Sequence, residues 1–238
     1  MAATQTSPNR NVGSLRRFRY LLDIVILIVA VFALEAAFAA VYSPKSMKVA
    51  FTLDALVQMV QVAVAWLLIR LRGETLAAIG LMRPKSWGRT LGIGVAIAFV
   101  VFVGMFISEK MGFRRDLSRF NFIHGNLELT VYGVFYALIG AGFYEEFMFR
   151  GFLMQGVAML FGGSHRAWIA ACIVQAVAFG VSHSYQNPLG MLITGTLGFL
   201  LGLLVYRSGP NLWAAIIAHG LYDASRFVSF YFQAPPTG

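Results

Sequence analysis

Long apolar runs alternate with short polar connectors along the whole chain. About 20 consecutive apolar residues are enough to span a bilayer as a helix, so each long run is a candidate membrane helix. The runs cover roughly residues 20–42, 52–70, 90–108, 127–161, 167–184, 188–206 and 211–232. The pattern therefore predicts an all-α, polytopic membrane bundle of about seven transmembrane helices.

Two of these runs have features that bear on their geometry. The fourth, 127–161, is too long for a simple span, so we expect it to be tilted, broken or extended beyond the lipid. The second opens near Thr52 or Asp54, either of which is a suitable helix cap. A turn near Ser164 separates the fourth run from the fifth, which predicts an antiparallel hairpin.

Composition and charge support a membrane protein. The chain of 238 residues is 58% hydrophobic and 12% charged, whereas soluble domains are about 45–50% apolar and about 25% charged. The net charge of +9 would suggest a nucleic-acid partner in a soluble protein. Here the basic residues cluster in connectors, where they anchor helix ends and set topology. We therefore expect the lipid bilayer as a partner, and no nucleic acid.

The basic residues give a partial topology signal. The arginines of the N-terminal tail favour a cytoplasmic N-terminus, and the long first run predicts a retained helix rather than a cleaved signal peptide. Four further basic residues would fall on the other side of the membrane and argue against this orientation: Lys110, Arg114, Arg115 and Arg119. The single cysteine, Cys172, excludes an internal disulfide and a Cys-cluster metal site.

Ionisable residues interrupt the fourth run, although charges at membrane depth are expensive and need partners or a task. Glu146 and Arg150 are four apart on a helix and share one face, so we expect a structural ion pair. Glu145 is rotated from Glu146 by about 100° on an α-helix. Because Glu145 has no local basic partner, it is the stronger candidate for a functional group.

Histidines in two later runs complete a candidate site. Glu145 lies nineteen residues before the turn at Ser164 and His183 nineteen residues after it, so an antiparallel hairpin puts them at one level. His183 alone could instead bond a neighbouring carbonyl. His219 and Asp223 are four apart, a spacing at which a carboxylate can fix an imidazole tautomer. His219 lies nearer its own turn, so tilt, a kink or a stagger has to bring it level. Together these residues predict an intramembrane polar cavity.

Three other carboxylates lie in the first two predicted helices. Glu35 stands alone in the middle of the first predicted helix. The sequence leaves its role open, and the favoured interpretation is a structural hydrogen bond. Asp23 and Asp54 lie near predicted helix starts, where negative charge suits the helix dipole. We interpret both as structural.

Three motifs, in order, resemble those of the CPBP family, the CAAX proteases and bacteriocin-processing proteins, also called Abi. This family includes CAAX prenyl protease 2 and lysostaphin resistance protein A-like proteins. EEFMFR (Glu145 to Arg150) resembles its EExxxR signature, and FGVSH (Phe179 to His183) resembles FxxxH. HGLYD (His219 to Asp223) resembles the third motif, a His followed four residues later by Asn or Asp.

The resemblance covers roughly residues 127–230, and it divides the chain into four parts. These are a cytoplasmic basic tail at 1–19, N-terminal transmembrane helices and connectors at 20–126, a CPBP-type catalytic core at 127–232 and a C-terminal tail at 233–238. The first three predicted helices carry no diagnostic motif.

The resemblance implies an intramembrane endopeptidase in which Glu145 is the general base that activates water. It further implies that His183 helps to hold this water and that His219 with Asp223 faces the scissile carbonyl. Where the family has Asn, an amide N–H can donate to the oxyanion. Asp223 must therefore carry a proton to do the same, or else it only orients His219.

The resemblance also assigns supporting and optional roles. Glu146, Arg150 and Phe179 would brace the site. No cofactor is required by the pattern, but one variant keeps Zn²⁺ on His183, His219 and Asp223, since two histidines and one carboxylate form an accepted catalytic zinc set. A His-Glu-x-x-His zinc motif is missing from the sequence.

The implied substrate is a peptide or membrane protein: a prenylated CAAX protein, a leader peptide or a membrane-protein segment. The expected location is a bacterial inner membrane. Two other classes stay open at this point. One is a non-catalytic membrane scaffold or bacteriocin-immunity protein with the same fold. The other is a small transporter that uses the Glu/His cluster as a proton relay.

Overall fold

The computed structural model describes residues 10–41, 46–209 and 211–233. Its helices are α1 (Arg10–Val41), α2 (Met47–Leu71), α3 (Trp87–Lys110), α4 (Leu127–Tyr136), η3 (Ala137–Leu153), α5 (Met154–Leu160), α6 (His165–Ser182), α7 (Asn187–Arg207) and α8 (Trp213–Phe232). Three short 3₁₀ helices are η1 (Leu76–Ile79), η2 (Ser118–Ile123) and η4 (Ser184–Gln186). No strand occurs in these described ranges, so the predicted all-α fold is confirmed.

Helix boundaries differ from the sequence prediction mainly near the N-terminus. α1 begins at Arg10, well before the predicted start at residue 20, and no proline lies in the basic stretch between them. α2 begins at Met47 with Ser46 as its N-cap residue. The expected cap at Thr52 or Asp54 is therefore wrong. Residues 1–9 and 234–238 of the two predicted tails lie outside the described residues.

Six helices in the described part of the chain are long and apolar enough to cross a membrane. They are Ser14–Val41, Met47–Leu71, Trp87–Lys110, Leu127–Leu160, His165–Ser182 and Ser184–Arg207. The seventh predicted span is α8, whose 20 residues are less hydropathic because they include His219, Asp223 and Arg226. α8 packs against α3, α4 and η3, which shelters these polar groups.

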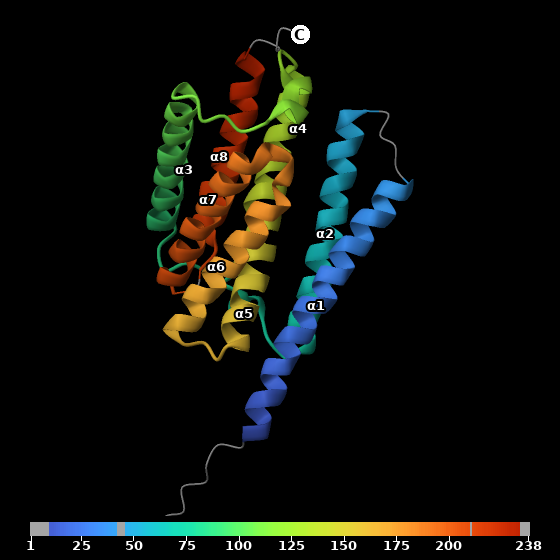
Figure 1. The fold of residues 1–238 in the computed structure, drawn as a ribbon, viewed down its shortest axis with the longest axis vertical. Coiled ribbons are helices and arrows are strands. Elements are labelled where there is room, and N and C mark those ends of the chain that lie inside the picture. The colour runs from blue at the N-terminus through green and yellow to red at the C-terminus, as the bar shows by residue number, and fades with distance from the viewer. Residues whose placement is uncertain (1–9, 42–45, 210, 234–238) are drawn as a thin grey trace, which may run out of the picture.

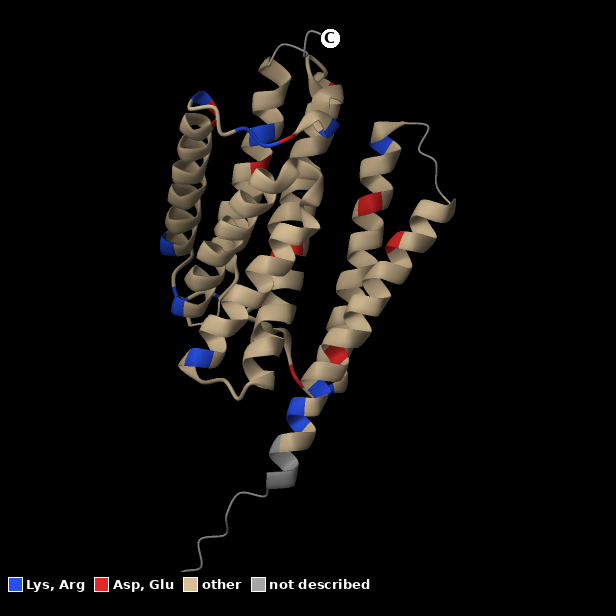
Figure 2. Ribbon diagram, in the orientation of Figure 1, with Lys and Arg blue, Asp and Glu red and all other residues tan. Residues whose placement is uncertain are grey.

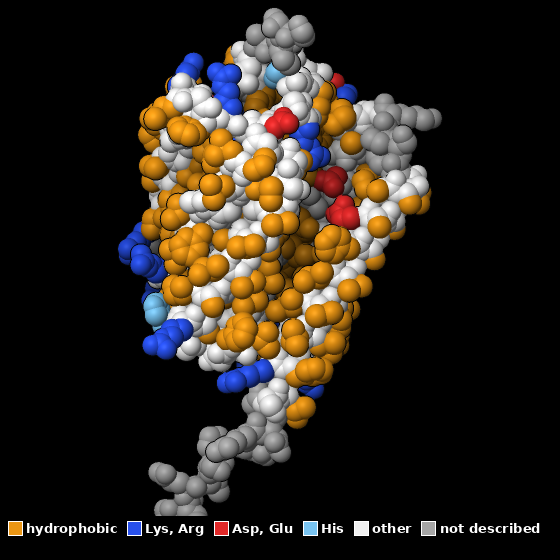
Figure 3. Space-filling model, in the orientation of Figure 1, with side chains coloured by type: hydrophobic (Ala, Val, Ile, Leu, Met, Phe, Trp, Pro, Cys, Tyr) orange, Lys and Arg blue, Asp and Glu red, His pale blue; other side chains and the backbone are white. Residues whose placement is uncertain are grey.

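The helices form two groups (Figure 1). α1 and α2 make an antiparallel pair at one side, and the remaining helices form a bundle with α3 at its far edge. Lys and Arg lie mainly toward the two ends of the helices (Figure 2), and apolar side chains cover most of the surface between them (Figure 3). This distribution fits helices that cross a bilayer side by side. The protein is thus an integral, multi-pass membrane protein.

Glycines let η3 and α8 approach each other closely. A Cβ atom added at Gly142 would lie 3.0 Å from the Cα of Gly220 and 3.2 Å from the carbonyl oxygen of Ile216. Small residues at such crossings are what allow membrane helices to pack backbone against backbone. The crossing matters because it brings the carboxylates of η3 next to His219 of α8.

A bulky residue at this crossing should destabilise the bundle. We expect Gly142→Val to lower stability by about 1–3 kcal/mol, since the atoms it meets are backbone and cannot move aside. Thermal unfolding in detergent measures the effect. The matched control is Gly104→Val in α3, where an added Cβ meets nothing within 4 Å. Equal unfolding midpoints for the two variants would contradict the prediction.

Candidate active site

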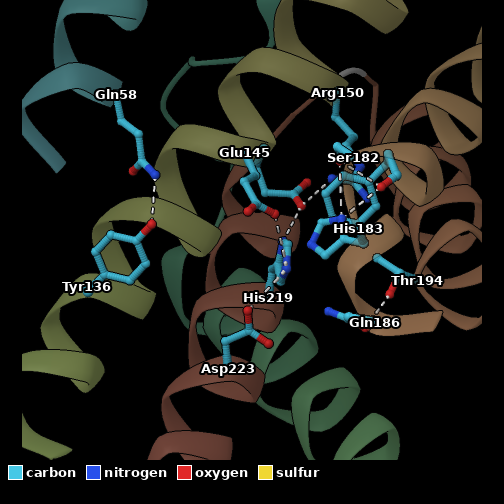
Figure 4. A network of polar contacts seen from close by, with 12 residues as sticks. Gln58, Tyr136, Glu145, Arg150, Ser182, His183, Gln186, Thr194, His219 and Asp223 are labelled. Atoms are coloured by element: carbon cyan, nitrogen blue, oxygen red, sulfur yellow. Dashed lines mark hydrogen bonds and ion pairs between the residues drawn. The ribbon is translucent and has the colours of Figure 1, made fainter. Parts of the chain in front are cut away.

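A cavity of about 680 Å³ lies between the α1–α2 pair and the bundle. Figure 3 shows the surface hollowed in this region. The polar side chains that line it include all four residues proposed from the sequence: Glu145, His183, His219 and Asp223. They come from η3, the end of α6 and α8, and they point toward one another (Figure 4).

Glu146 and Arg150 form the ion pair that their spacing predicts. Arg150 Nη1 lies 2.9 Å from Glu146 Oε1, and both side chains are completely buried. The guanidinium also lies over the ring of Phe179, 4.1 Å from its centroid. This cation–π contact ties η3 to α6, so Arg150 connects two of the helices that supply the site.

His219 is oriented by Glu146, and the expectation that Asp223 does so is wrong. His219 Nδ1 lies 2.8 Å from Glu146 Oε1, whereas His219 Nε2 is 3.7 Å from Asp223 Oδ2, beyond hydrogen-bond distance. The carboxylate of Glu146, paired with Arg150, can only accept. The Nδ1 atom of His219 therefore carries the proton, which leaves Nε2 with a lone pair when the ring is neutral.

Glu145 faces the other edge of the same imidazole. Glu145 Oε2 lies 3.8 Å from His219 Nε2 and is buried without a hydrogen-bond partner among the described residues. A buried oxygen left unpaired costs about 1–3 kcal/mol. An unpaired buried atom needs a specific explanation, and a functional role of Glu145 in the cavity provides one.

Both carboxylates of η3 reach His219, one at each ring nitrogen. η3 is a π-helix over 17 residues, and its wider turn rotates successive side chains by less than the 100° of an α-helix. The sequence argument assumed an α-helix and placed Glu145 on a different face from Glu146. In the structure the two side chains contact opposite edges of one ring. π-helical turns occur frequently at functional sites.

His183 follows the last residue of α6 and bonds a neighbouring carbonyl, which is one of the two interpretations that the sequence offered. Its Nδ1 atom lies 2.8 Å from the carbonyl oxygen of Phe179, so Nδ1 donates and Nε2 of the neutral ring is an acceptor. The same imidazole lines the cavity. The Phe179 ring lies 4.7 Å from the His183 ring and 5.7 Å from the His219 ring, and thus packs beside both imidazoles.

The side chains as placed do not form the zinc set considered from the sequence. Among the described residues, no group of three His, Cys, Asp or Glu side chains is arranged to hold a metal ion. His183, His219 and Asp223 line one cavity, but His219 Nε2 is turned toward Glu145 as much as toward Asp223.

Sequence reasoning missed two polar ties that join α2 to the site-bearing helix. In the first, the Tyr144 hydroxyl donates to Gln61, and Gln61 Nε2 donates to Glu35 Oε1 at 2.8 Å. Glu35 is thus partnered rather than alone. The available signal was Gln61 itself, a polar residue within an apolar run.

The second tie involves Asp54, and it corrects the role assigned to that residue. The Tyr136 hydroxyl donates to Asp54, and Gln58 Nε2 lies 2.9 Å from the Tyr136 oxygen. Asp54 lies inside α2, which begins at Met47, so it does not serve the helix dipole. Asp23 likewise lies within α1 and pairs with Arg72 at 2.7 Å.

Fold and site together define a polytopic, all-helical membrane protein with a buried Glu/His cluster from three helices. Residues 127–225 match the family model described as Type II CAAX prenyl endopeptidase Rce1-like. This segment contains all three motifs, and the match confirms the resemblance found in the sequence. Among curated proteins and among solved structures, no significant match was found.

Proposed function

We propose that the protein is an intramembrane endopeptidase that hydrolyses a peptide bond with a water activated by Glu145. The observation that carries this proposal is the buried, unpartnered Oε2 atom of Glu145, 3.8 Å from His219 Nε2. Two polar atoms at this separation can share one water molecule. The match of residues 127–225 to a protease family model supports the same reaction class.

The proposed reaction begins with proton transfer from water to Glu145. As the water oxygen bonds to the scissile carbonyl carbon, Glu145 takes the proton, acting as general base. Nε2 of His183, left as an acceptor by the bond from Nδ1 to Phe179, helps to orient the water. Glu145 then passes a proton to the leaving nitrogen as the carbon–nitrogen bond breaks. The products are a carboxylate and an amine.

Negative charge on the carbonyl oxygen needs a hydrogen-bond donor during this step. His219 and Asp223 line the cavity beside Glu145. A protonated Asp223 can donate from its carboxyl group, and His219 can donate from Nε2 when its ring carries a second proton. Preorganised donors are most effective in a site that excludes bulk water. Glu146, with Arg150 behind it, holds the His219 ring in place for this purpose.

Asp223 is expected to act as a donor rather than as the partner that orients His219. Asp223→Asn should therefore keep activity within about tenfold of wild type, since an amide also donates, while Asp223→Ala should lose about 10²–10³-fold. Rates of peptide cleavage measure both. Equal losses in the two variants would contradict a donor role and favour an electrostatic need for the carboxylate.

The proposed function is tested with the purified protein in liposomes. Candidate substrates are a prenylated CAAX peptide, a leader peptide and a membrane-protein segment, each assayed with and without a chelator. Cleavage of at least one establishes a peptidase, and loss of cleavage with the chelator would restore the zinc alternative. A scaffold or immunity protein cleaves none of them. Proton movement across the liposome membrane without cleavage would favour the transporter.

A further inference from the structure

A second pocket, of about 400 Å³, lies between the connector that precedes α3 and the turn that joins α7 to α8. It is separate from the cavity that contains Glu145, since no described residue lines both. A water molecule occupies about 30 Å³ in the liquid, so the pocket has room for a much larger ligand. No carboxylate of the described chain lines it. We call it the basic pocket, because its charged lining residues are Arg83, Lys85, Arg89 and Arg207.

The four cations of the basic pocket lack counter-charges. Their side chains are exposed, and none of them forms an ion pair with a carboxylate of the described ranges. Two other arginines show the contrast, since Arg16 and Arg72 both pair with Glu74, at 3.4 Å and 3.2 Å. Like charges around one pocket repel one another, whereas an anion placed among them is attracted by all four. The charge arrangement therefore favours a bound anion.

Hydrogen bonds between two distant segments fix the walls of the basic pocket. Asn211 Nδ2 donates to the carbonyl oxygen of Met82 at 3.1 Å, and the Leu212 amide donates to the carbonyl oxygen of Gly80 at 3.0 Å. Both bonds hold the connector before α3 against the turn between α7 and α8. The Ser86 hydroxyl, which also lines the pocket, accepts from a backbone N–H of α3 at 3.3 Å. Its own proton is therefore available to an oxygen atom of a ligand.

The basic pocket lies where membrane helices end. α3 begins at Trp87 and α7 ends at Arg207, and both helices are long and apolar enough to cross a membrane. The ring of Trp87 contacts that of Trp213 edge to face, with centroids 5.2 Å apart. Tryptophan, lysine and arginine at the ends of membrane helices are typical of the level of the lipid headgroups. The pocket is thus at headgroup level, toward the end of the molecule where α1 begins (Figure 1).

We propose that the basic pocket binds the phosphate of an anionic glycerophospholipid. Arginine donates to phosphate through two parallel N–H bonds, and these bonds are charge-assisted. Basic pockets between membrane helices at headgroup level are suited to anionic lipids. A zwitterionic headgroup fits less well, because its ammonium group meets four cations and no carboxylate among the described lining residues. The site is independent of the reaction proposed at Glu145.

The test titrates the full-length protein, in detergent, with two lipids that have the same acyl chains. Dioleoyl phosphatidylglycerol carries a net negative charge, and dioleoyl phosphatidylcholine is zwitterionic. Native mass spectrometry counts the bound lipids and gives their dissociation constants. We expect one saturable phosphatidylglycerol site, with an affinity at least about tenfold higher than that for phosphatidylcholine, since each nearby cation contributes about fivefold.

Variants assign the preference to the basic pocket. Arg83→Gln combined with Arg89→Gln should lower the affinity for phosphatidylglycerol about 25-fold and leave that for phosphatidylcholine unchanged. Arg207→Gln should lower it about fivefold, which provides a second measurement should the double variant fail to fold. The matched control is Arg70→Gln combined with Arg166→Gln. These two exposed arginines, in the last turn of α2 and the first turn of α6, do not line the pocket, so the affinity should not change.

Each outcome decides the inference without reference to peptide cleavage. Equal affinities for the two lipids overturn it. A preference that falls equally in the pocket variants and in the control reports the charge of the whole surface, and also overturns it. Displacement of phosphatidylglycerol by an equimolar concentration of inorganic phosphate would assign the pocket to a soluble anion instead of a lipid. A preference for phosphatidylglycerol that is lost only in the pocket variants supports the site.

Discussion

Glu145→Gln is expected to abolish peptide cleavage while the fold stays intact. The amide has the shape of the carboxylate but cannot take a proton from water. General-base catalysis contributes about 10²–10⁴-fold, so the rate should fall by at least that range. The Oε2 atom of Glu145 has no hydrogen-bond partner among the described residues, so little structural stabilisation is lost. Cleavage rates and thermal unfolding of the purified variant measure the two effects.

A second carboxylate of the same long helix provides the control. Glu128 lies in the first turn of α4, and its exposed side chain pairs with Lys48. Glu128→Gln removes a similar charge away from the cavity and should leave the cleavage rate unchanged. Wild-type activity in Glu145→Gln would exclude Glu145 as the base. Unfolding of Glu145→Gln, by contrast, would show that its carboxylate stabilises the bundle.

Arg150→Leu is expected to give the largest loss of stability. The substitution leaves the carboxylate of Glu146, which is completely buried, without its cation. Removing one member of a buried ion pair costs about 3–5 kcal/mol. It also removes the contact with Phe179 that joins η3 to α6. A lowered midpoint of thermal unfolding in detergent is the measured result.

A double variant separates charge from packing. Glu146→Gln combined with Arg150→Leu removes both charges, so stability should recover in part relative to Arg150→Leu alone. Activity should stay low, because Glu146 holds the Nδ1 atom of His219. If the double variant is no more stable than Arg150→Leu, lost packing of the guanidinium, and not the unpaired charge, dominates the effect.

Local spacing explains which parts of the site could be predicted from the sequence. Run lengths locate the membrane helices because a helix has to cross a fixed thickness of hydrocarbon. The pair of Glu146 and Arg150 follows from a spacing of four residues, which aligns side chains within one helix. The prediction that Glu145 and His183 lie at one membrane level requires only their equal spacing from the turn at Ser164 and an antiparallel hairpin. All of these features depend on contacts close in sequence or on one hairpin.

Contacts between distant helices were not predictable in the same way. His219 is bonded to Glu146 because η3 and α8 cross at Gly142 and Gly220, and no local pattern gives the rotation of one helix against another. The π-helical form of η3 has no periodicity that distinguishes it in an apolar run. The ties of Asp54 and Glu35 likewise depend on how the α1–α2 pair docks.

The two walls of the cavity are held by different kinds of interaction. On one side, backbones meet at Gly142 and Gly220, and this interlocking leaves no freedom to adjust. On the other side, Tyr136 and Tyr144 are hydrogen-bonded to Asp54 and Gln61. An incoming peptide amide can replace these partners, so that no polar atom is left without a hydrogen bond. A bound peptide is therefore accommodated by movement on the side of α2, while the crossing of η3 and α8 preserves the geometry of Glu145 and His219.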